Sequence, residues 1–209
     1  MDSENKVQWV YSSKNEEELI ERYDEWAKTY DEDLERDFEY IGPRIAAAFF
    51  IKYVPDKKAR ILDAGAGTGI VGQVLNKAGY SNLEAMDMSP GMLEQARAKN
   101  VYQDLHRKVM GEPLGFATGA YNSTICVGTL TVGHAPASSL DELVRVTRPG
   151  GYIVYTLRPD VYEKNGFKEK HAALEAEGKW KLVEVSDPIQ VLPKGEPDVY
   201  HQVWIYRVL

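Results

Sequence analysis

Cysteine is almost absent from this 209-residue chain: Cys126 is the single one, so no disulfide can form within it. A long apolar run is also missing, and we expect neither a signal peptide nor a membrane-spanning helix. Bases are too few to balance the acids, since 25 Lys and Arg face 32 Asp and Glu for a formal charge of -7. Nucleic acids and anionic membranes attract basic faces, so neither is an expected partner. The composition favours a cytoplasmic protein that acts on a neutral or cationic small molecule.

The composition that is present, 44% hydrophobic and 27% charged, suits one globular domain with a sizeable core. We predict a flexible N-terminus over residues 1–12 and a single domain over residues 13–209. Within that domain, residues 13–54 are expected to form a helical cap and residues 59–209 the core. The oligomeric state leaves no readable signal in the sequence.

The predicted cap begins with a capping box, in which Ser13 is followed three residues later by Glu16. Tyr23, Trp26 and Tyr30 then fall on one stripe of a helix, which must pack on another element. Twelve acids and three bases lie between residues 16 and 39. We interpret this excess as a solvated helical face, with a recognition surface as the alternative.

A glycine-rich turn organises the rest of the chain. The apolar run that ends at Asp63 is followed by Gly65, Gly67 and Gly69, and then by apolar residues at helical spacing. This pattern predicts a strand that turns sharply into a helix, where glycines permit positive φ and a close approach of a ligand. About 20 residues further on, Asp87 closes the next apolar run, where a carboxylate can accept both hydroxyl protons of a ribose. The segment therefore predicts a nucleoside site.

Two motifs overlap in this turn. Residues 67–72 satisfy G-x-G-x-x-G, which is typical of dinucleotide sites, whereas residues 63–69 satisfy D-x-G-x-G-x-G. A dinucleotide site would push Asp63 and Gly65 into the buried strand, while the other register puts Asp63 at the strand end and all three glycines in the turn. The second register costs less, and we adopt it.

With these residues, the motifs at 23–31, 86–97, 127–130 and 140–151 occur in an order that resembles the class I S-adenosylmethionine (SAM)-dependent methyltransferases. The alternation of strands and helices, followed by two successive strands, independently predicts a mainly parallel α/β sheet with a final antiparallel hairpin. The resemblance implies a Rossmann-like fold with strand order 3-2-1-4-5-7-6, strand 7 antiparallel, helices on both faces and an N-terminal helical cap. It also implies SAM as cofactor and S-adenosylhomocysteine (SAH) as product.

The resemblance further implies where the cofactor binds. The glycine turn would pass beneath the methionine and ribose portion, Asp87 would accept the ribose hydroxyls, and Met88 and Met92 would flank adenine. Aromatic rings of the cap would lie against the sulfonium. For Cys126, near the expected methyl position, apolar packing is the alternative. The residues implied for this site are Tyr23, Trp26, Tyr30, Asp63, Gly65, Ala66, Gly67, Asp87, Met88, Met92, Met110, Gly111 and Cys126.

The adenine edge departs from the family pattern, because Val109 stands where an aspartate is common and cannot accept a hydrogen bond from the amino group. Backbone groups at Met110 and Gly111, or the Glu112 carboxylate, are the alternatives. Residues 127–130 also lack the Asn or Asp followed by two prolines that marks enzymes acting on adenine or glutamine amino groups. The acceptor is therefore expected to be a different small molecule.

His134 is the only histidine expected at the mouth of the sheet, where it could serve as general base for a hydroxyl acceptor. A loop histidine without a catalytic role is the alternative, and no metal site is expected. Two other functions stay open: a nicotinamide-dependent oxidoreductase that uses the overlapping glycine motif, and a non-catalytic module that binds SAM and a protein partner. The oxidoreductase would need a catalytic Tyr-Lys or His-Asp set, which the sequence does not display.

Overall fold

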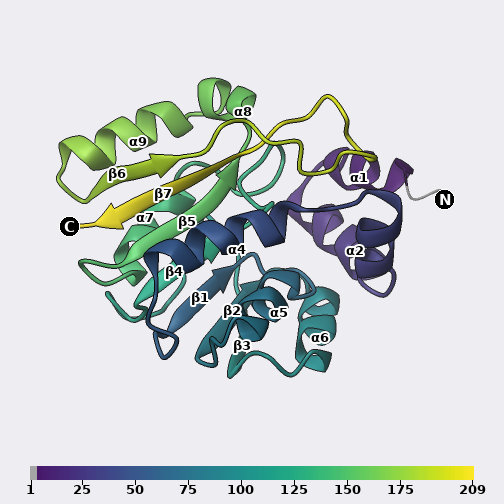
Figure 1. The fold of residues 1–209 in the computed structure, drawn as a ribbon. Helices are drawn as coiled ribbons and strands as arrows, with labels where there is room; N and C mark the ends of the chain where they lie inside the picture. The colour runs from purple at the N-terminus through teal and green to yellow at the C-terminus, as the bar shows by residue number, and fades with distance from the viewer. Residues whose placement is uncertain (1–3) are drawn as a thin grey trace.

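The computed structural model describes residues 4–209, and a seven-stranded sheet in the order β3-β2-β1-β4-β5-β7-β6 forms its centre (Figure 1). Strand β7 is antiparallel to both of its neighbours, and the other pairs of adjacent strands are parallel. The strand order and the antiparallel strand 7 predicted from the sequence are thus confirmed. The strands are β1 (Ile61–Ala64), β2 (Leu83–Asp87), β3 (Asp104–Arg107), β4 (Ser123–Cys126), β5 (Tyr152–Leu157), β6 (Trp180–Val185) and β7 (Gln202–Val208).

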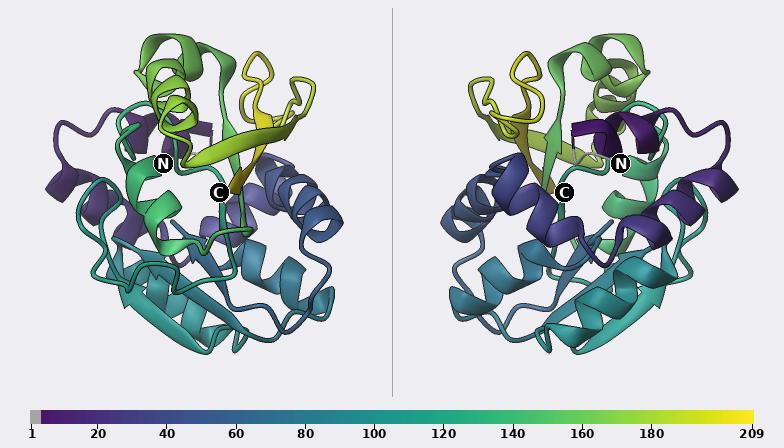
Figure 2. Two further views of the ribbon diagram at one scale, coloured as in Figure 1. Left: turned by 90° about the vertical axis from the view of Figure 1, so that its left-hand side faces the viewer. Right: turned by 90° about the vertical axis from the view of Figure 1, so that its right-hand side faces the viewer.

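Helices lie on both faces of the sheet, as the two side views in Figure 2 show. On one face α4 and α5 pack on β1, β4, β5 and β7; on the other, α7, α8 and α9 bury their apolar residues. None of the helices in residues 4–209 is long and apolar enough to cross a membrane. They are α1 (Glu4–Tyr11), α2 (Glu16–Trp26), α3 (Tyr30–Glu32), the π-helix η1 (Asp33–Asp37), α4 (Gly42–Tyr53), α5 (Ile70–Lys77), α6 (Pro90–Ala98), α7 (Ser139–Val146), α8 (Pro159–Lys164) and α9 (Phe167–Ala176).

The helices that frame the site begin at recognisable sequence signals. Ser89 caps α6 by accepting the backbone N–H of Met92 at 3.0 Å, and Pro90 takes the first helical position, where its missing N–H costs nothing. Helix α2 differs from the expectation. Its cap is Asn15, which accepts the N–H of Glu18 at 2.8 Å, and not Ser13. An asparagine is as good a cap as a serine, so the signal was present two residues downstream.

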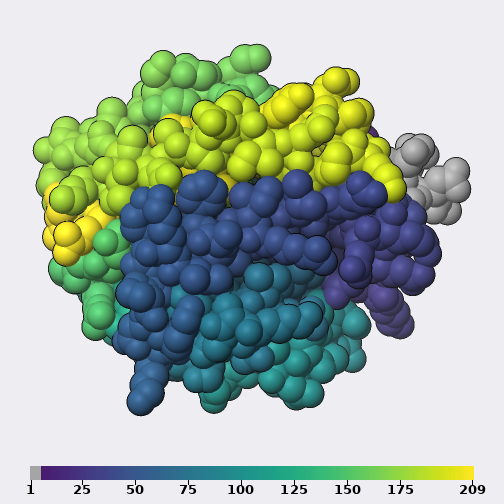
Figure 3. Space-filling model, viewed as in Figure 1, coloured from purple at the N-terminus to yellow at the C-terminus, as the bar shows by residue number. Residues whose placement is uncertain are grey.

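Residues 4–11 form helix α1, although a flexible segment was predicted over residues 1–12. Val7 and Val10 are buried in a cluster with Leu19 of α2 and with Val191 and Leu192. In Figure 3 the yellow segment before β7 adjoins the purple N-terminal helices. A helix this short is marginal in isolation and depends on tertiary contacts. Val7 and Val10 alone therefore did not mark it as a helix in the sequence. Residues 1–3 lie outside the described residues.

Two further elements differ from the sequence expectations. The sequence alone marks a third strand only weakly and favours residues 107–110 for it, whereas β3 occupies Asp104–Arg107 at the sheet edge, where its side chains are partly exposed. An edge strand needs no apolar pattern, so the sequence marked it weakly. Helix α8 was not predicted at all; it is only six residues long, with Pro159 at its start.

Candidate functional site

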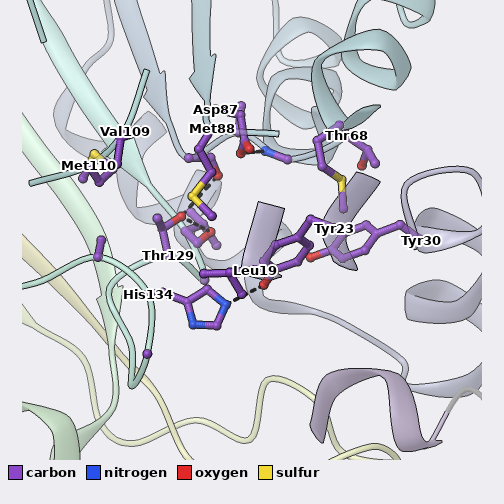
Figure 4. Close-up of a pocket in the computed structure, with 18 of the residues that line it drawn as sticks. Leu19, Tyr23, Tyr30, Thr68, Asp87, Met88, Val109, Met110, Thr129 and His134 are labelled. Carbon is purple, nitrogen blue, oxygen red and sulfur yellow. Dashed lines mark hydrogen bonds between the residues drawn. The ribbon is translucent and has the colours of Figure 1, made fainter. Parts of the chain in front are cut away.

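A cavity of about 430 Å³ opens at the carboxyl ends of β1, β2 and β4 (Figure 4). The turn after β1, the start of α6 and the loops after β3 and β4 form its floor and sides, and α2 covers it. In open α/β sheets this edge is where ligands bind, because successive loops converge there. The volume lies within the range of small-molecule sites.

The turn after β1 has the register predicted from the sequence. Asp63 belongs to the buried end of β1, and Gly65, Gly67 and Gly69 follow with φ values of 71°, 54° and 87°. A Cβ on Gly65 would overlap the side chain of Thr129, whereas a Cβ on Gly67 would meet nothing within 4 Å. The backbone at Gly67 is therefore open toward the cavity, as a ligand passing over the turn requires.

Asp87 lies at the end of β2, in the wall of the cavity. One carboxylate oxygen accepts the backbone N–H of Gly67 at 2.8 Å and the other accepts that of Ser89 at 2.9 Å. Burial raises the pKa of this carboxyl, and the two N–H groups oppose the shift. Each carboxylate oxygen has two lone pairs, so both can accept a further hydrogen bond.

Asp63 lies behind the turn and outside the cavity wall. It is 1% exposed, and its Oδ2 accepts the Tyr102 hydroxyl at 2.6 Å, while the Tyr102 oxygen accepts the Gly72 N–H at 3.1 Å. A Cβ on Gly72 would overlap the Tyr102 ring. Gly72, the last glycine of the overlapping dinucleotide motif, is thus accounted for by the packing of Tyr102.

Two acids of the N-terminal segment fix the covering helices to the core. Asp24 accepts the hydroxyl of Ser89 at 2.5 Å and the N–H of Gly91 at 2.7 Å, and a Cβ on Gly91 would crowd the Asp24 backbone. Asp31 accepts the Thr68 hydroxyl and, at 2.5 Å, the ammonium of Lys99. The acidic excess read as a solvated face therefore includes groups that position α2 and α3 over the cavity.

Tyr23 and His134 meet inside the cavity, as Figure 4 shows. The Tyr23 hydroxyl lies 2.7 Å from His134 Nε2, and His134 Nδ1 lies 2.9 Å from the carbonyl oxygen of Val132. A carbonyl only accepts, so Nδ1 carries the proton and Nε2 accepts from Tyr23. Burial lowers the pKa of His134 and keeps the imidazole neutral. Burial also raises the pKa of Tyr23, so its phenol is protonated.

Nine of the thirteen residues predicted for the cofactor site line the cavity together, and His134 joins them. Trp26 lies behind the wall, and its indole N–H donates to Asp33 at 2.8 Å. Cys126 packs in the core among apolar residues, where burial raises the pKa of its thiol to about 12. Asp63 and Gly111 are also outside the wall. The nine residues are Tyr23, Tyr30, Gly65, Ala66, Gly67, Asp87, Met88, Met92 and Met110.

The cavity also contains residues that the sequence reading missed. Tyr40 and Thr129 line it beside the end of β4, and Leu19 lines it from α2. For Leu19 the signal was indirect, because it lies one helical turn before Tyr23 on the helix that the sequence predicts. Tyr40 carried no such signal, because its ring reaches the site from the segment between η1 and α4.

The adenine edge predicted from the resemblance is the loop after β3. Val109, Met110 and Lys108 line the cavity there, whereas Glu112 is exposed and outside the wall. Glu112 is therefore not placed to substitute for the missing acid. Among residues 4–209, no cluster of three His, Cys, Asp or Glu side chains could hold a metal ion.

Comparison with known proteins identifies the family to which this chain belongs. A family model described as "Methyltransferase domain" matches residues 62–155. Human Methyltransferase-like protein 27 is 36% identical over 165 residues, which are 76% of this chain and 66% of that protein. The malonyl-[acyl-carrier protein] O-methyltransferase of Serratia marcescens is 36% identical over 100 residues, 46% of this chain and 37% of that protein. The chain thus spans about two thirds or less of the length of these relatives.

A solved structure agrees on the fold. The magnesium protoporphyrin IX methyltransferase of Synechocystis PCC 6803, determined with bound SAM, superimposes with a TM-score of 0.61. The two are 13% identical over 100% of this chain and 98% of that one. Fold, glycine turn and sequence relatives together define a class I SAM-dependent methyltransferase domain, and the chain belongs to that class. The nicotinamide oxidoreductase considered from the sequence is therefore not retained.

Proposed function

We propose that this protein transfers the methyl group of SAM to a small-molecule acceptor in the cytoplasm, as the sequence predicts, and that this acceptor is uncharged. The observation that carries the proposal is Asp87, which lies in the cavity wall with both oxygens already oriented by the glycine turn and by Ser89. Such a carboxylate is arranged to accept a pair of adjacent hydroxyl groups, as on a ribose.

The residues of the cavity suit this cofactor in three regions. Asp87 would hold the ribose over the open backbone at Gly67. Met88 and Met92 present polarisable apolar surface that suits adenine, and the backbone of the loop at Met110 would meet its edge in place of the missing acid. The rings of Tyr23 and Tyr30 suit a cation, because burial keeps both phenols neutral and ring faces attract a sulfonium.

SAM supplies a methyl group on a sulfonium, so the protein must mainly bind, orient and exclude water. Helices α2 and α3 supply the cover, through the contacts that Asp24 and Asp31 make with the core. His134 is the proposed general base. Its Nδ1 proton is fixed on the Val132 carbonyl, and Nε2, which now accepts from Tyr23, would accept the proton of an acceptor hydroxyl.

The relatives do not identify the acceptor, because the name of the human protein gives none and that of the Serratia marcescens protein gives malonyl-[acyl-carrier protein]. The order of the motifs also resembles the methyltransferase-like protein from the Williams-Beuren syndrome region. We propose that the present chain shares its general reaction class. Most charged residues that line the cavity lie at its rim or on the loop after β3, and only Asp87 lies in its interior. The interior therefore supports an uncharged acceptor.

The proposal is tested by calorimetric titration of the purified protein with SAM, SAH and NAD in parallel. We expect SAM and SAH to bind at micromolar affinity and NAD to give no signal, because the glycine turn and Asp87 suit a single nucleoside. Binding of NAD without SAM or SAH would contradict the register of the site. Binding of SAM without turnover on any acceptor would favour the non-catalytic module.

The protonation state of His134 gives a second, spectroscopic prediction. Burial lowers its pKa from the ordinary value of about 6.5, so we expect a neutral imidazole with the proton on Nδ1 at physiological pH. Nitrogen-15 NMR of the histidine side chains, titrated over pH, measures both, and His134→Gln assigns the signal by removing it. Titration above pH 6.5 would contradict the lowered pKa, and a proton on Nε2 would exclude the proposed base, because that nitrogen could not then accept one.

A further inference from the structure

A second, smaller cavity of about 50 Å³ lies beside the first, and we call it the inner cavity. It is bounded by α1, α2, the end of β4 and the segment before β7. Four residues line both cavities, namely Tyr23, Tyr30, Tyr40 and Gly128. The inner cavity is therefore adjacent to the proposed methyl-transfer site, and the three tyrosines line both cavities.

His201 lines the inner cavity and is 7% exposed. Its Nδ1 is buried and has no hydrogen-bond partner among the described residues. Burial and, to a smaller extent, the nearby Arg158 lower the pKa of this imidazole to about 4, against the opposing charge of Asp160, so the ring is neutral. A buried polar atom without a partner costs free energy and is rare in native proteins, so this imidazole calls for a partner that the described residues do not supply.

The rest of the lining is uncharged and rich in aromatic rings, which suits an uncharged aromatic group. None of the twelve residues that line the inner cavity is charged, and five are aromatic. Burial raises the pKa of Tyr11 to about 12 and raises that of Tyr40 as well, so these phenols are protonated. The indole N–H of Trp26 is already bonded to Asp33. Among the residues that line the inner cavity, His201 is thus the polar side chain with a buried atom that lacks a hydrogen-bond partner.

We propose that the inner cavity is an acceptor subsite, where His201 hydrogen-bonds a neutral oxygen, hydroxyl or keto, on a planar acceptor. The acceptor class is then a phenol- or quinol-type compound with two oxygens on one ring system. One oxygen lies at His201, and the other, which takes the methyl group, lies in the larger cavity near the Tyr23–His134 pair. This inference rests on the proposed methyl-transfer function and names its substrate class.

The experiment compares three probes on the SAH-saturated protein by ligand-observed NMR titration. Hydroquinone carries two hydroxyls across one ring, phenol lacks the second oxygen, and 4-hydroxybenzoate replaces it with an anion. We expect hydroquinone to bind about fivefold more tightly than phenol, the contribution of one net hydrogen bond, and 4-hydroxybenzoate to bind least.

The variants test whether His201 makes that bond. In His201→Phe the preference for hydroquinone over phenol should disappear, while SAH affinity and thermal stability stay equal or rise, because an apolar ring replaces an unpartnered polar group. His201→Gln keeps a polar group and should retain part of the preference, which decides the case if the phenylalanine variant fails to fold. His106→Gln, on β3 at the far edge of the sheet, is the matched control and should behave as the parent protein.

The possible failures are distinguishable. SAH binding without any preference for hydroquinone, or with a preference that persists in both His201 variants, overturns the subsite and leaves the methyl-transfer proposal intact; a water molecule is then the partner of His201. Absence of SAH binding in the parent protein overturns both. A preference for 4-hydroxybenzoate overturns the neutral acceptor class.

Discussion

Replacing Asp87 with alanine should weaken SAM and SAH binding by at least about 100-fold. Each hydrogen bond to an ionised carboxylate contributes about 1.5–3 kcal/mol, and the variant would lose two of them to the ribose. The same change removes the partner of the Gly67 N–H, so the turn also loses part of its preorganisation. Calorimetric titration with SAH measures the effect directly.

Two further variants separate recognition from simple loss of structure. Asp87→Asn preserves the shape but carries an amide whose N–H₂ faces existing N–H donors, so we expect it to bind SAH nearly as poorly as alanine. Asp104→Ala removes an exposed carboxylate from the start of β3, outside the cavity, and should bind SAH as the parent does. Parent-like affinity in Asp87→Ala would mean that the ribose is held elsewhere.

The parts of the site that are local in sequence could be predicted from it. The turn from Asp63 to Gly69, its register and the placement of Asp87 about 20 residues later follow from strand, turn and helix patterns that span few residues. The sheet order followed from the alternation of elements together with the family resemblance. In each case local backbone chemistry or periodicity marks the element in the sequence, and distant contacts only stabilise that element.

Contacts between distant segments could not be predicted, because no periodicity encodes them. Asp24 bonds Ser89, and Tyr23 bonds His134 across 111 positions of sequence. The sequence gives a tyrosine stripe and a loop histidine separately; only the fold brings them to 2.7 Å. The same holds for Tyr102, which lies far from Gly72 in sequence and explains why that glycine is needed.

Asp63 illustrates how such a contact changes the chemistry of a residue that the sequence placed correctly. The motif predicts a carboxylate at the strand end, and the fold buries it completely, with its Oδ1 lacking a partner among the described residues. Burial raises the pKa of Asp63 to about 7, the hydrogen bond from Tyr102 opposes the shift, and the nearby Asp87 adds to it. The residue therefore titrates near neutral pH, behind the proposed binding site.

Asp63→Asn should make the protein more resistant to unfolding at alkaline pH than the parent. An Asp in the unfolded chain has a pKa of about 3.9, so between about pH 4 and pH 7 the folded protein holds a proton that the unfolded chain releases. The contribution of Asp63 to stability is then complete below about pH 4 and is lost as pH rises through about 7, at up to roughly 1.4 kcal/mol per pH unit. Asparagine cannot ionise, so the variant escapes this loss.

Chemical unfolding of both proteins at several pH values between about 5 and 8 measures the difference. Because other carboxylates titrate equally in the two proteins, subtracting the curves isolates Asp63, and the advantage of the asparagine variant should grow as the pH rises to about 7 and then level off. Tyr102→Phe tests the cause: it removes the hydrogen bond that lowers the pKa of Asp63, so the loss should extend to higher pH. A constant difference between parent and Asp63→Asn across this range would show that the buried carboxyl is already ionised at the acid end, with a partner that stabilises its charge.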